Sequence, residues 1–282
     1  MFDCALILEG GGMRGVYTAG ILDYFLEQGL EFSSVYGVSA GALNGANFVS
    51  RQHGRSIRTF TEYLDDERYS GARYLFKNGD WFNIDFVYNE IPNKLDVVDW
   101  DTFAASKTKF YAVLSNVVTG KAEYHRVTDL RKQMDTVRRS ASLPLLSTIV
   151  NINGKKYLDG GICDSIPLYR SIQDGNRKNV VILTQHRGFE KQPVSNMGLV
   201  KLRYRRYPKF VRANRYRHLM YNNQTKYVYQ KEKDGQAFVI QPKEPVNIDR
   251  LEKDTEKLWR LYRAGYNDAK ENFDRLMKYL GE

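Results

Sequence analysis

Ser39 is the residue of this sequence whose surroundings most clearly indicate chemistry. It sits in the run Gly-Val-Ser-Ala-Gly at residues 37–41. The preceding residues 32–36 predict a short strand, and the small or apolar residues 42–49 predict a buried helix. Glycines on both sides permit a cramped turn from strand to helix that leaves the serine hydroxyl exposed. This context is typical of a hydrolase nucleophile, although a short pattern of this kind also arises by chance.

A second run, Gly-Gly-Gly-Met-Arg-Gly at residues 10–15, predicts a site for an anion. It follows the apolar residues 4–8, which predict a buried strand, and precedes residues 16–28, whose apolar side chains recur at helical spacing. A glycine-rich turn that opens a helix presents backbone N–H groups at the positive end of the helix dipole. In a hydrolase such groups stabilise the charge that develops on a carbonyl oxygen under attack. Consecutive parallel strands place their turns at one edge of a sheet, so both runs are expected to lie together.

Two nucleotide-binding interpretations of the second run fail on neighbouring residues. The glycines at positions 10, 12 and 15 satisfy the dinucleotide-binding pattern, but the second strand ends in Val35-Tyr36-Gly37 and lacks the acidic residue that holds a ribose. A P-loop needs Lys and then Ser or Thr after the last glycine, where this chain has Val16 and Tyr17. An oxyanion hole is the interpretation that remains.

Asp159 is the candidate general base. It precedes Gly160 and Gly161 and follows a predicted hairpin around Asn153-Gly154. Tight glycine turns allow its carboxylate to approach the serine closely enough to take its proton. Taken alone, an Asp-Gly pair more often marks a simple turn, but the two runs described above favour the catalytic interpretation.

Four separated motifs together resemble the patatin-like phospholipases, a family of serine lipid acyl hydrolases that use a Ser-Asp dyad. The motifs are residues 10–15, residues 37–41, the run Ser-Ala-Ser-Leu-Pro at 140–144, and residues 159–161. The resemblance covers residues 1 to about 185, and the remaining residues resemble more weakly the extra C-terminal region of some bacterial members. It implies a three-layer α/β/α fold with a mainly parallel central sheet, plus a mostly helical C-terminal extension.

The resemblance also implies a role for each motif. Ser39 would be the nucleophile and Asp159 the general base. The backbone N–H groups of the glycine loop, chiefly those of Gly11, Gly12 and Met13, would form the oxyanion hole. Arg14 would fix that loop through hydrogen bonds or attract a lipid phosphate. The other loop-supporting residues are Gly10, Gly15, Gly37, Gly41, Gly160 and Gly161. An ordinary aspartate has a pKa of about 3.9 and is a weak base toward serine, so Asp159 must be partly desolvated.

A Ser-His-Asp triad is the alternative within hydrolases. His186 follows the strand candidate 180–184, and the chain order Ser39, Asp159, His186 suits an α/β-hydrolase. The motifs above resemble a dyad enzyme, and lone histidines are more often structural, so His186 is the secondary candidate. No spacing typical of a metal site occurs in the sequence, and neither a metal nor a cofactor is expected.

Length and composition indicate the domain organisation and location of the chain. With 282 residues and 42% hydrophobic content, it can form a full α/β core with an appendage. We expect a catalytic domain at residues 1–188, and a basic segment with a helical extension packed on it at residues 189–282. No apolar run approaches the ~18 residues of a membrane span and the N-terminus lacks a basic segment, so a cytoplasmic location is expected. Cys4 and Cys163 have neither disulfide-rich nor metal spacing and are expected to be free thiols.

Residues 191–231 carry all of the excess positive charge. They contain eleven Lys or Arg and no Asp or Glu, so they carry +11 while the other residues sum to −1. Their densest part, residues 201–212, interleaves cations with aromatics, which suits an anionic membrane surface and nucleic-acid phosphates equally. The plainer interpretation is a helix whose long basic side chains cover the core. Because a lipid hydrolase needs a bilayer and no nucleic-acid motif is visible, we expect a lipid or acyl-ester substrate, peripheral contact with the anionic inner membrane surface, and no nucleic acid.

The remaining segments predict the surrounding elements. Residues 51–107 are expected to mix helix and loop, and the aromatic cluster at 81–88 is interpreted as core packing, with an acyl pocket as the alternative. Strands are predicted at 109–115, 122–126 and 236–241, and a helix at 128–139. From Asp249, with Glu252 completing a capping box, the chain is expected to be helical to its end.

Together these observations predict a hydrolase of carboxylic lipid esters, of the phospholipase A or lipid acyl hydrolase type, that works through an acyl-Ser39 intermediate. Two alternatives stay open at this point. One is a catalytically idle protein that binds lipid or an anionic surface through residues 191–231, and the other is transfer of the acyl group to an acceptor other than water.

Overall fold

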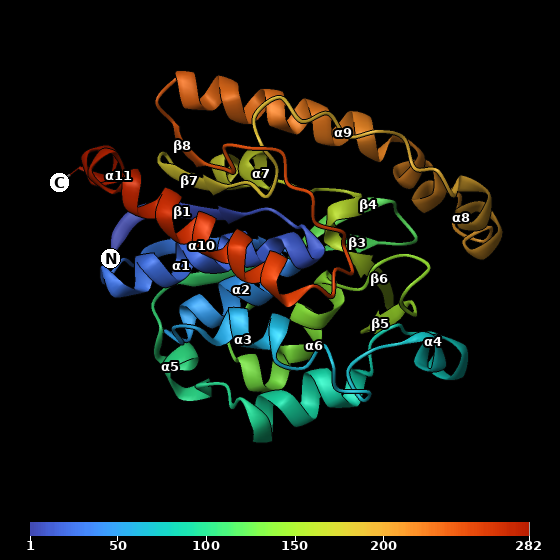
Figure 1. Cartoon of the computed structure of the whole chain (residues 1–282). Coiled ribbons are helices and arrows are strands. Elements are labelled where there is room, and N and C mark those ends of the chain that lie inside the picture. Colours follow the sequence, from blue (N-terminus) through green and yellow to red (C-terminus); the bar gives the residue numbers. More distant parts are fainter. Residues whose placement is uncertain (282) are drawn as a thin grey trace.

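A central β-sheet organises the chain in the computed structural model, which describes residues 1–281. Among these residues the sheet has eight strands in the order β5-β6-β3-β2-β1-β7-β8, with β4 paired to β3 (Figure 1). The strands are β1 (Phe2–Leu8), β2 (Phe32–Val38), β3 (Lys109–Asn116), β4 (Lys121–Val127), β5 (Val150–Ile152), β6 (Lys155–Asp159), β7 (Asn179–Ile182) and β8 (Ala237–Ile240). The pairs β1–β2, β1–β7, β2–β3 and β7–β8 are parallel, whereas β4, β5 and β6 pair antiparallel. The predicted mainly parallel sheet is confirmed.

Helices cover both faces of this sheet, because its central strands are apolar on both sides. In β1, Leu6 and Leu8 belong to one hydrophobic cluster with residues of α1 (Gly15–Glu27), α2 (Ala40–Val49) and α6 (Leu130–Ser140). The alternate residues Ala5 and Ile7 pack against α7 (Leu168–Gln173) and α9 (Pro208–Lys233) on the opposite face. The two helical layers are visible on either side of the strands in Figure 1. The predicted three-layer α/β/α arrangement is therefore confirmed.

The shorter elements also follow the sequence pattern. Residues 51–107 mix helix and loop as predicted, with α3 (Arg55–Thr61), α4 (Ala72–Asn78), the π-helix η2 (Phe86–Leu95) and α5 (Trp100–Ala105). Two short 3-10 helices, η1 (Gly12–Arg14) and η3 (Gly160–Ile162), fall within the first and last of the four motifs. The predicted hairpins at 109–126 and around residues 153–154 are both formed. The strand predicted at 180–184 is observed one residue earlier and ends at Ile182.

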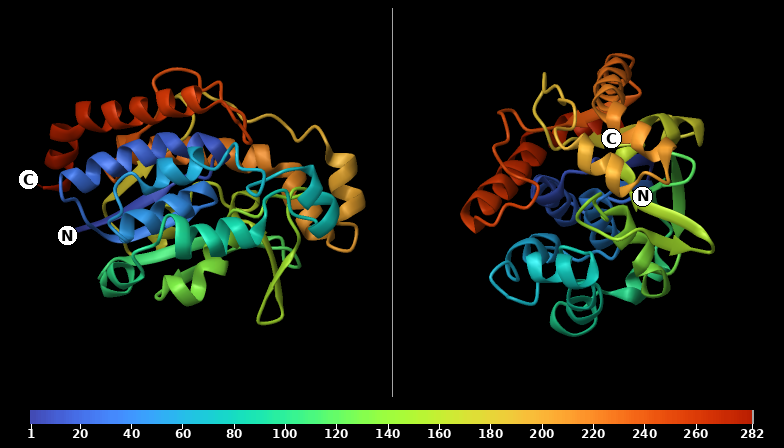
Figure 2. Two further views of the ribbon diagram at one scale, coloured as in Figure 1. Left: turned by 60° about the horizontal axis from the view of Figure 1, so that its bottom comes forward. Right: turned by 90° about the vertical axis from the view of Figure 1, so that its right-hand side faces the viewer.

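The C-terminal region contributes to the same core. Strand β8 extends the sheet beside β7, and α10 (Thr255–Glu271) lies along α1, as Figures 1 and 2 show. The two helices approach closely: a Cβ atom on Gly265 would lie 2.0 Å from the carbonyl oxygen of Tyr17. The Tyr17 hydroxyl also donates a hydrogen bond to Asp268 at 2.7 Å. The helical extension is thus packed on the rest of the protein, and the domain boundary after residue 188 remains a prediction.

The start of the last helical region differs from the prediction. Asp249 and Glu252 do not form a helix N-terminus, because α10 begins at Thr255, where Asp254 accepts a hydrogen bond from the Lys257 N–H at 3.1 Å. The helix also ends at Glu271, and a separate helix, α11 (Phe273–Leu280), follows. The segment before α10 lacks helical structure and instead bonds to the glycine loop, a tertiary contact that outweighs the local capping pattern.

Both cysteines are free thiols, as expected. Cys4 is buried in β1, and burial raises its pKa to about 12. Cys163 is half-buried after η3, and burial raises its pKa to about 11. Neither thiol therefore ionises near neutral pH.

Candidate active site

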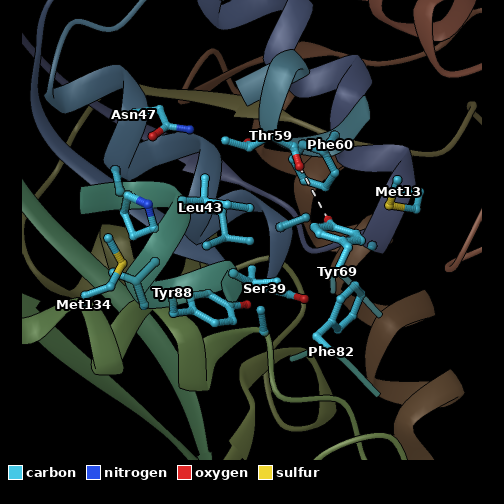
Figure 3. A pocket seen from close by; sticks show the side chains of 18 of the residues that line it. Met13, Ser39, Leu43, Asn47, Thr59, Phe60, Tyr69, Phe82, Tyr88 and Met134 are labelled. Carbon is cyan, nitrogen blue, oxygen red and sulfur yellow. Dashed lines mark hydrogen bonds between the residues drawn. The ribbon is translucent and has the colours of Figure 1, made fainter. Parts of the chain in front are cut away.

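The turn that carries Ser39 is strained and tightly packed. Ser39 lies between β2 and α2 with φ 55° and ψ −123°, a conformation that costs energy for a residue with a side chain. The turn packs against the end of β1, where a Cβ atom on Gly41 would lie 2.5 Å from the Leu8 carbonyl oxygen. Glycine is needed at position 41 because of this approach. Ser39 is 6% exposed and its side chain faces a cavity (Figure 3).

Strand β3 brings Ser39 and Asp159 together. At one edge, β3 pairs first with β2, where Val38 lies opposite Val113, and then with β6, where Asp159 lies opposite Leu114. The ends of β2 and β6 thus meet along consecutive residues of β3. The turn after Asp159 needs glycine, since a Cβ atom on Gly160 would lie 2.0 Å from the Val113 carbonyl oxygen. Sheet register therefore aligns two residues 120 positions apart in the sequence.

The carboxylate of Asp159 is buried and only partly hydrogen-bonded. Asp159 is 1% exposed, and its Oδ1 accepts a hydrogen bond from the Gly161 N–H at 2.8 Å. Its Oδ2 has no partner at normal hydrogen-bond geometry among the described residues, although the nearby Ser39 hydroxyl is one of the groups that lower the pKa of Asp159. Burial dominates and raises this pKa, with Arg217 the strongest opposing influence. Such a carboxylate is a stronger base than an exposed aspartate.

The run at residues 140–144 ties both candidate catalytic residues to α6. The hydroxyl of Ser140 accepts a hydrogen bond from the Ser39 N–H at 2.8 Å and donates one to the Val113 carbonyl at 2.7 Å. Two residues later, the Ser142 carbonyl accepts the Asp159 N–H at 2.8 Å. Sequence reasoning used this run only as part of a resemblance and gave Ser140 no role. Ser140 is 0% exposed, so solvent water does not replace the hydrogen-bond partners of its hydroxyl.

The glycine loop lies directly beside the serine turn. A Cβ atom on Gly10 would stand 3.0 Å from Cβ of Ser39. No described residue accepts a hydrogen bond from the N–H groups of Gly11 and Gly12, whereas the Met13 N–H donates to the Arg250 carbonyl at 3.3 Å. Two of the three predicted oxyanion donors are therefore available, and the third is engaged by the segment before α10.

Arg14 contacts the same segment through its side chain. Its Nη1 donates to the Ile248 carbonyl at 3.4 Å, while its Nε is buried without a partner among the described residues. Burial lowers the pKa of Arg14, and Glu9 is the main group that opposes this change. The loop-fixing role expected for Arg14 stays a prediction.

The cavity next to Ser39 is small and mostly apolar, with a volume of about 120 Å³. Figure 3 shows Leu43, Phe60, Tyr69 and Met134 around it, supplied by α2, α3, the loop after α3 and α6. The residues of the aromatic cluster at 81–88 lie in two different environments. Phe86 is buried in the core, as predicted, but Phe82, Val87 and Tyr88 line the cavity. Phe82 and Val87 also pack against the core cluster that contains Phe86, so the interpretation as core packing holds for them but omits their place in the cavity wall. Val87 and Tyr88 reach that wall from η2, and Phe82 from the residues before it.

Two cations that sequence reasoning did not assign to the site lie beside it. Arg217 comes from α9, and its Nε donates to the Gly161 carbonyl at 2.6 Å. Arg250 belongs to the segment before α10 and lines the cavity near Ser39. Burial lowers the pKa of Arg217 to about 10, with the charge of Arg250 adding to the effect. No local signal distinguishes Arg217 from the other ten cations of residues 191–231.

His186 does not join this group. Its Nδ1 lies 2.8 Å from the Arg187 carbonyl oxygen, and its ring packs edge-on against Phe189. Within residues 1–281, no histidine lines the cavity that contains Ser39. The same part of the chain contains no cluster of three or more His, Cys, Asp or Glu suited to a metal ion. None of its helices combines the length and apolarity needed to cross a bilayer.

Comparisons with known proteins agree with the fold and the motifs. The profile of the patatin-like phospholipases matches residues 6–170, and a profile of a domain of unknown function, DUF6363, matches residues 207–281. The solved structure of VipD from Legionella pneumophila aligns with 96% of this chain and 67% of its own, at a TM-score of 0.52 and 14% identity. At that identity the likeness concerns the fold alone.

Three curated relatives extend these matches. The uncharacterized protein YjjU of Escherichia coli K12 is 30% identical over 185 residues, which are 64% of this chain and 51% of YjjU. The probable lipid hydrolase 463L of Invertebrate iridescent virus 6 is 22% identical over 62% of this chain and 65% of its own. Lysophospholipase NTE1 of Cryptococcus neoformans is 26% identical over 63% of this chain and 11% of its own. This chain thus spans about half of YjjU and a small part of NTE1. Because the family profile covers more than half of its residues, the chain belongs to the patatin-like phospholipase family.

Proposed function

We propose that this protein hydrolyses carboxylic esters of lipids through an acyl intermediate on Ser39. Membership of the family supports a lipid ester as substrate, as do relatives named as a lysophospholipase and a probable lipid hydrolase. The observation that carries the proposal is the alignment of Ser39 and Asp159 along β3, with Ser39 in the wall of an apolar cavity. The apolar lining of the cavity suits the alkyl part of an acyl group, and the Ser-Asp pair suits ester cleavage.

In the first half of the reaction, Asp159 takes the proton of the Ser39 hydroxyl as the oxygen attacks the ester carbonyl. The carbonyl π electrons move to its oxygen, and the free N–H groups of Gly11 and Gly12 stabilise this oxyanion. The tetrahedral intermediate collapses, the bond to the leaving alcohol breaks, and Asp159 returns the proton to that alcohol. The raised pKa of Asp159 favours the first transfer, because it makes the carboxylate a stronger base toward the serine hydroxyl.

In the second half, Asp159 accepts a proton from a water molecule that attacks the acyl-serine. The same loop stabilises the second oxyanion, and Ser39 leaves with the proton from Asp159 as the fatty acid is released. Participation of the Met13 N–H requires the Arg250 carbonyl to move away from it, because the two are hydrogen-bonded. Gly11 and Gly12 form the oxyanion hole without any such movement.

We further propose that α8 (Met197–Arg203) and the start of α9 contact an anionic membrane surface peripherally, on the cytoplasmic side. These elements project at one end of the molecule in Figure 1. Leu199 and Leu202 are 58% and 67% exposed there, amid the exposed cations Lys201, Arg203, Arg205 and Arg206. Exposed leucines among cations fit the interface of an anionic bilayer better than they fit water.

Trapping of the intermediate tests the proposed chemistry. A slowly hydrolysed long-chain p-nitrophenyl ester is mixed with the protein, the reaction is quenched in acid, and intact and peptide masses are measured. The expected result is one acyl group on the peptide that contains Ser39, together with free fatty acid as the product. An unmodified Ser39 during turnover, or an acyl group on another residue, contradicts the proposal.

A further inference from the structure

A second cavity adjoins the one that contains Ser39. Its volume is about 230 Å³, and it shares Leu143 and Arg250 with the apolar cavity. Its polar lining consists of Asn196, Asn214, Arg217 and Arg250, all from the C-terminal region. The remaining lining is aliphatic, from residues 143–146 and the loop before α8 among others. Arg250 lies in the wall of both cavities, whereas Arg217 lines only the second. Arg55, which also lines the apolar cavity, forms an ion pair with Asp96.

The positive charge around this second cavity is poorly compensated. Arg217 is held through Nε by the Gly161 carbonyl, and neither Arg217 nor Arg250 forms an ion pair with a carboxylate in the described part of the chain. Arg14 and Lys191 add to the local field, since each lies close enough to Arg250 for the two charges to repel. Glu9 and Asp159 face these cations, and Asp249 additionally faces Arg14.

This arrangement destabilises the charged forms of Lys191 and Arg217. Burial and neighbouring cations lower the pKa of Lys191 to about 7 and that of Arg217 to about 10. The Lys191 ammonium lies 4.1 Å from the ring centroid of Tyr221, a contact that stabilises a cation only modestly. Partly buried cations with so few counter-charges favour an anionic ligand, because the ligand supplies the missing charge.

We propose that the second cavity binds the phosphoryl group of a glycerophospholipid whose acyl chain occupies the apolar cavity. This inference rests on the proposed function of Ser39 and assigns head-group selectivity to Arg217 and Arg250. In a glycerophospholipid only a few bonds of glycerol separate the ester from the phosphate, so adjoining cavities suit the two parts of one molecule. A guanidinium binds phosphate oxygens through paired N–H groups, and Arg217 keeps its outer nitrogens for that purpose while Nε anchors it.

The test compares substrates that share an acyl chain and differ in head group. Palmitoyl lysophosphatidylglycerol, lysophosphatidylcholine and monopalmitoylglycerol are presented in micelles of one neutral detergent. For wild type, kcat/KM is expected to be higher on both phosphate-containing lipids. Arg250→Gln should lower the ratio of kcat/KM on these two lipids to kcat/KM on monopalmitoylglycerol by about tenfold or more. The control Arg260→Gln, an exposed cation of α10, removes the same charge and should change none of the three.

A second variant tests whether the loss in Arg250→Gln comes from the cavity and not from a local structural defect at residue 250. Val194 lines only the second of the two cavities, so Val194→Trp should obstruct the phosphate and reproduce the selective loss. Equal use of all three lipids by wild type, or an equal loss on all three in both variants, overturns the phosphoryl site while leaving ester hydrolysis intact. Absence of turnover on every lipid overturns the proposed function itself.

Inorganic phosphate is added to the monopalmitoylglycerol assay as a further arm. If it alters the wild-type rate but not that of Arg250→Gln, and the head group has no effect, the site takes a free anion and the lipid proposal is wrong.

Discussion

The hydroxyl of Ser140 bonds directly to the backbone of Ser39, accepting its N–H at 2.8 Å while donating to Val113 at 2.7 Å. Ser140 therefore connects α6, β3 and the strained serine turn through one side chain. A turn with φ 55° at a serine persists only when its surroundings determine it, and Ser140 supplies that support.

Ser140→Ala should weaken this turn. The Ser39 N–H loses its buried acceptor, which costs about 1–3 kcal/mol of the free energy of unfolding. We expect a lower Tm and a kcat that falls about tenfold or more as the hydroxyl of Ser39 loses its position. Ser142→Ala is the matched control, because the Ser142 hydroxyl bonds to Arg138 and not to the serine turn. Equal effects of the two substitutions would show that Ser140 has no particular role.

The pH dependence of activity should change when the positive charge of Arg217 is removed. Burial raises the pKa of Asp159 in the folded protein, and the base must be deprotonated, so activity is lost as the pH falls through this raised pKa. Arg217 is the strongest of the groups that lower it. Arg217→Gln should therefore move the acid limb of kcat/KM to higher pH.

The profile is measured with a neutral p-nitrophenyl ester, so that binding of a charged head group does not contribute. Arg250 has a weaker influence on Asp159, and Arg250→Gln should move the same limb less. An acid limb that stays in place or moves to lower pH in Arg217→Gln contradicts the assignment of that limb to Asp159.

The length of the acyl chain should be limited by the walls of the apolar cavity. Met134 lines this cavity from α6, as Figure 3 shows, and Met134→Trp would fill part of it. We expect kcat/KM for a palmitoyl ester to fall about tenfold relative to an acetyl ester, by the usual cost of overfilling a packed site. The acetyl ester is the internal control. A palmitoyl-to-acetyl ratio unchanged from wild type would place the chain elsewhere.

Membrane contact should depend on the exposed cations beside α8. Replacing Arg205 and Arg206 with Gln removes two charges, each worth about 1 kcal/mol near an anionic surface. Partitioning onto phosphatidylglycerol vesicles should weaken by about 10- to 30-fold at low salt, and the difference should shrink at high salt. The control replaces Arg260 and Arg263 of α10, both exposed, with Gln. If this control pair weakens binding as strongly, net charge and not this surface explains the attraction.

The fold could be predicted largely from the sequence, because local patterns determined it. The strands predicted at 4–8 and 32–36 are β1 and β2 in the structure, and the glycine-containing runs after them form turns that lie together at one edge of the sheet. The hairpin before Asp159 formed as its Asn-Gly pair predicted. In each case the decisive signal lies within a few neighbouring residues.

The features that could not be predicted depend on contacts between distant segments. Arg217 belongs to a run of cations that all suit a solvated helix, and only the docking of α9 on the sheet turns this one toward Gly161. Arg250 sits where a capping box predicted helix, but its carbonyl bonds to Met13. The sequence likewise predicts a core position for Tyr88, whereas in the structure η2 places this residue in the cavity wall. Composition and spacing carry no information about such pairings.

Hydrolysis of one p-nitrophenyl ester by folded wild type, Ser39→Ala, Asp159→Asn and His186→Ala tests the central claim most directly. We predict that Ser39→Ala and Asp159→Asn each lower kcat/KM by about 10³-fold or more, while His186→Ala remains within about twofold of wild type. A large loss in His186→Ala, or full activity in Asp159→Asn, would contradict the Ser-Asp dyad.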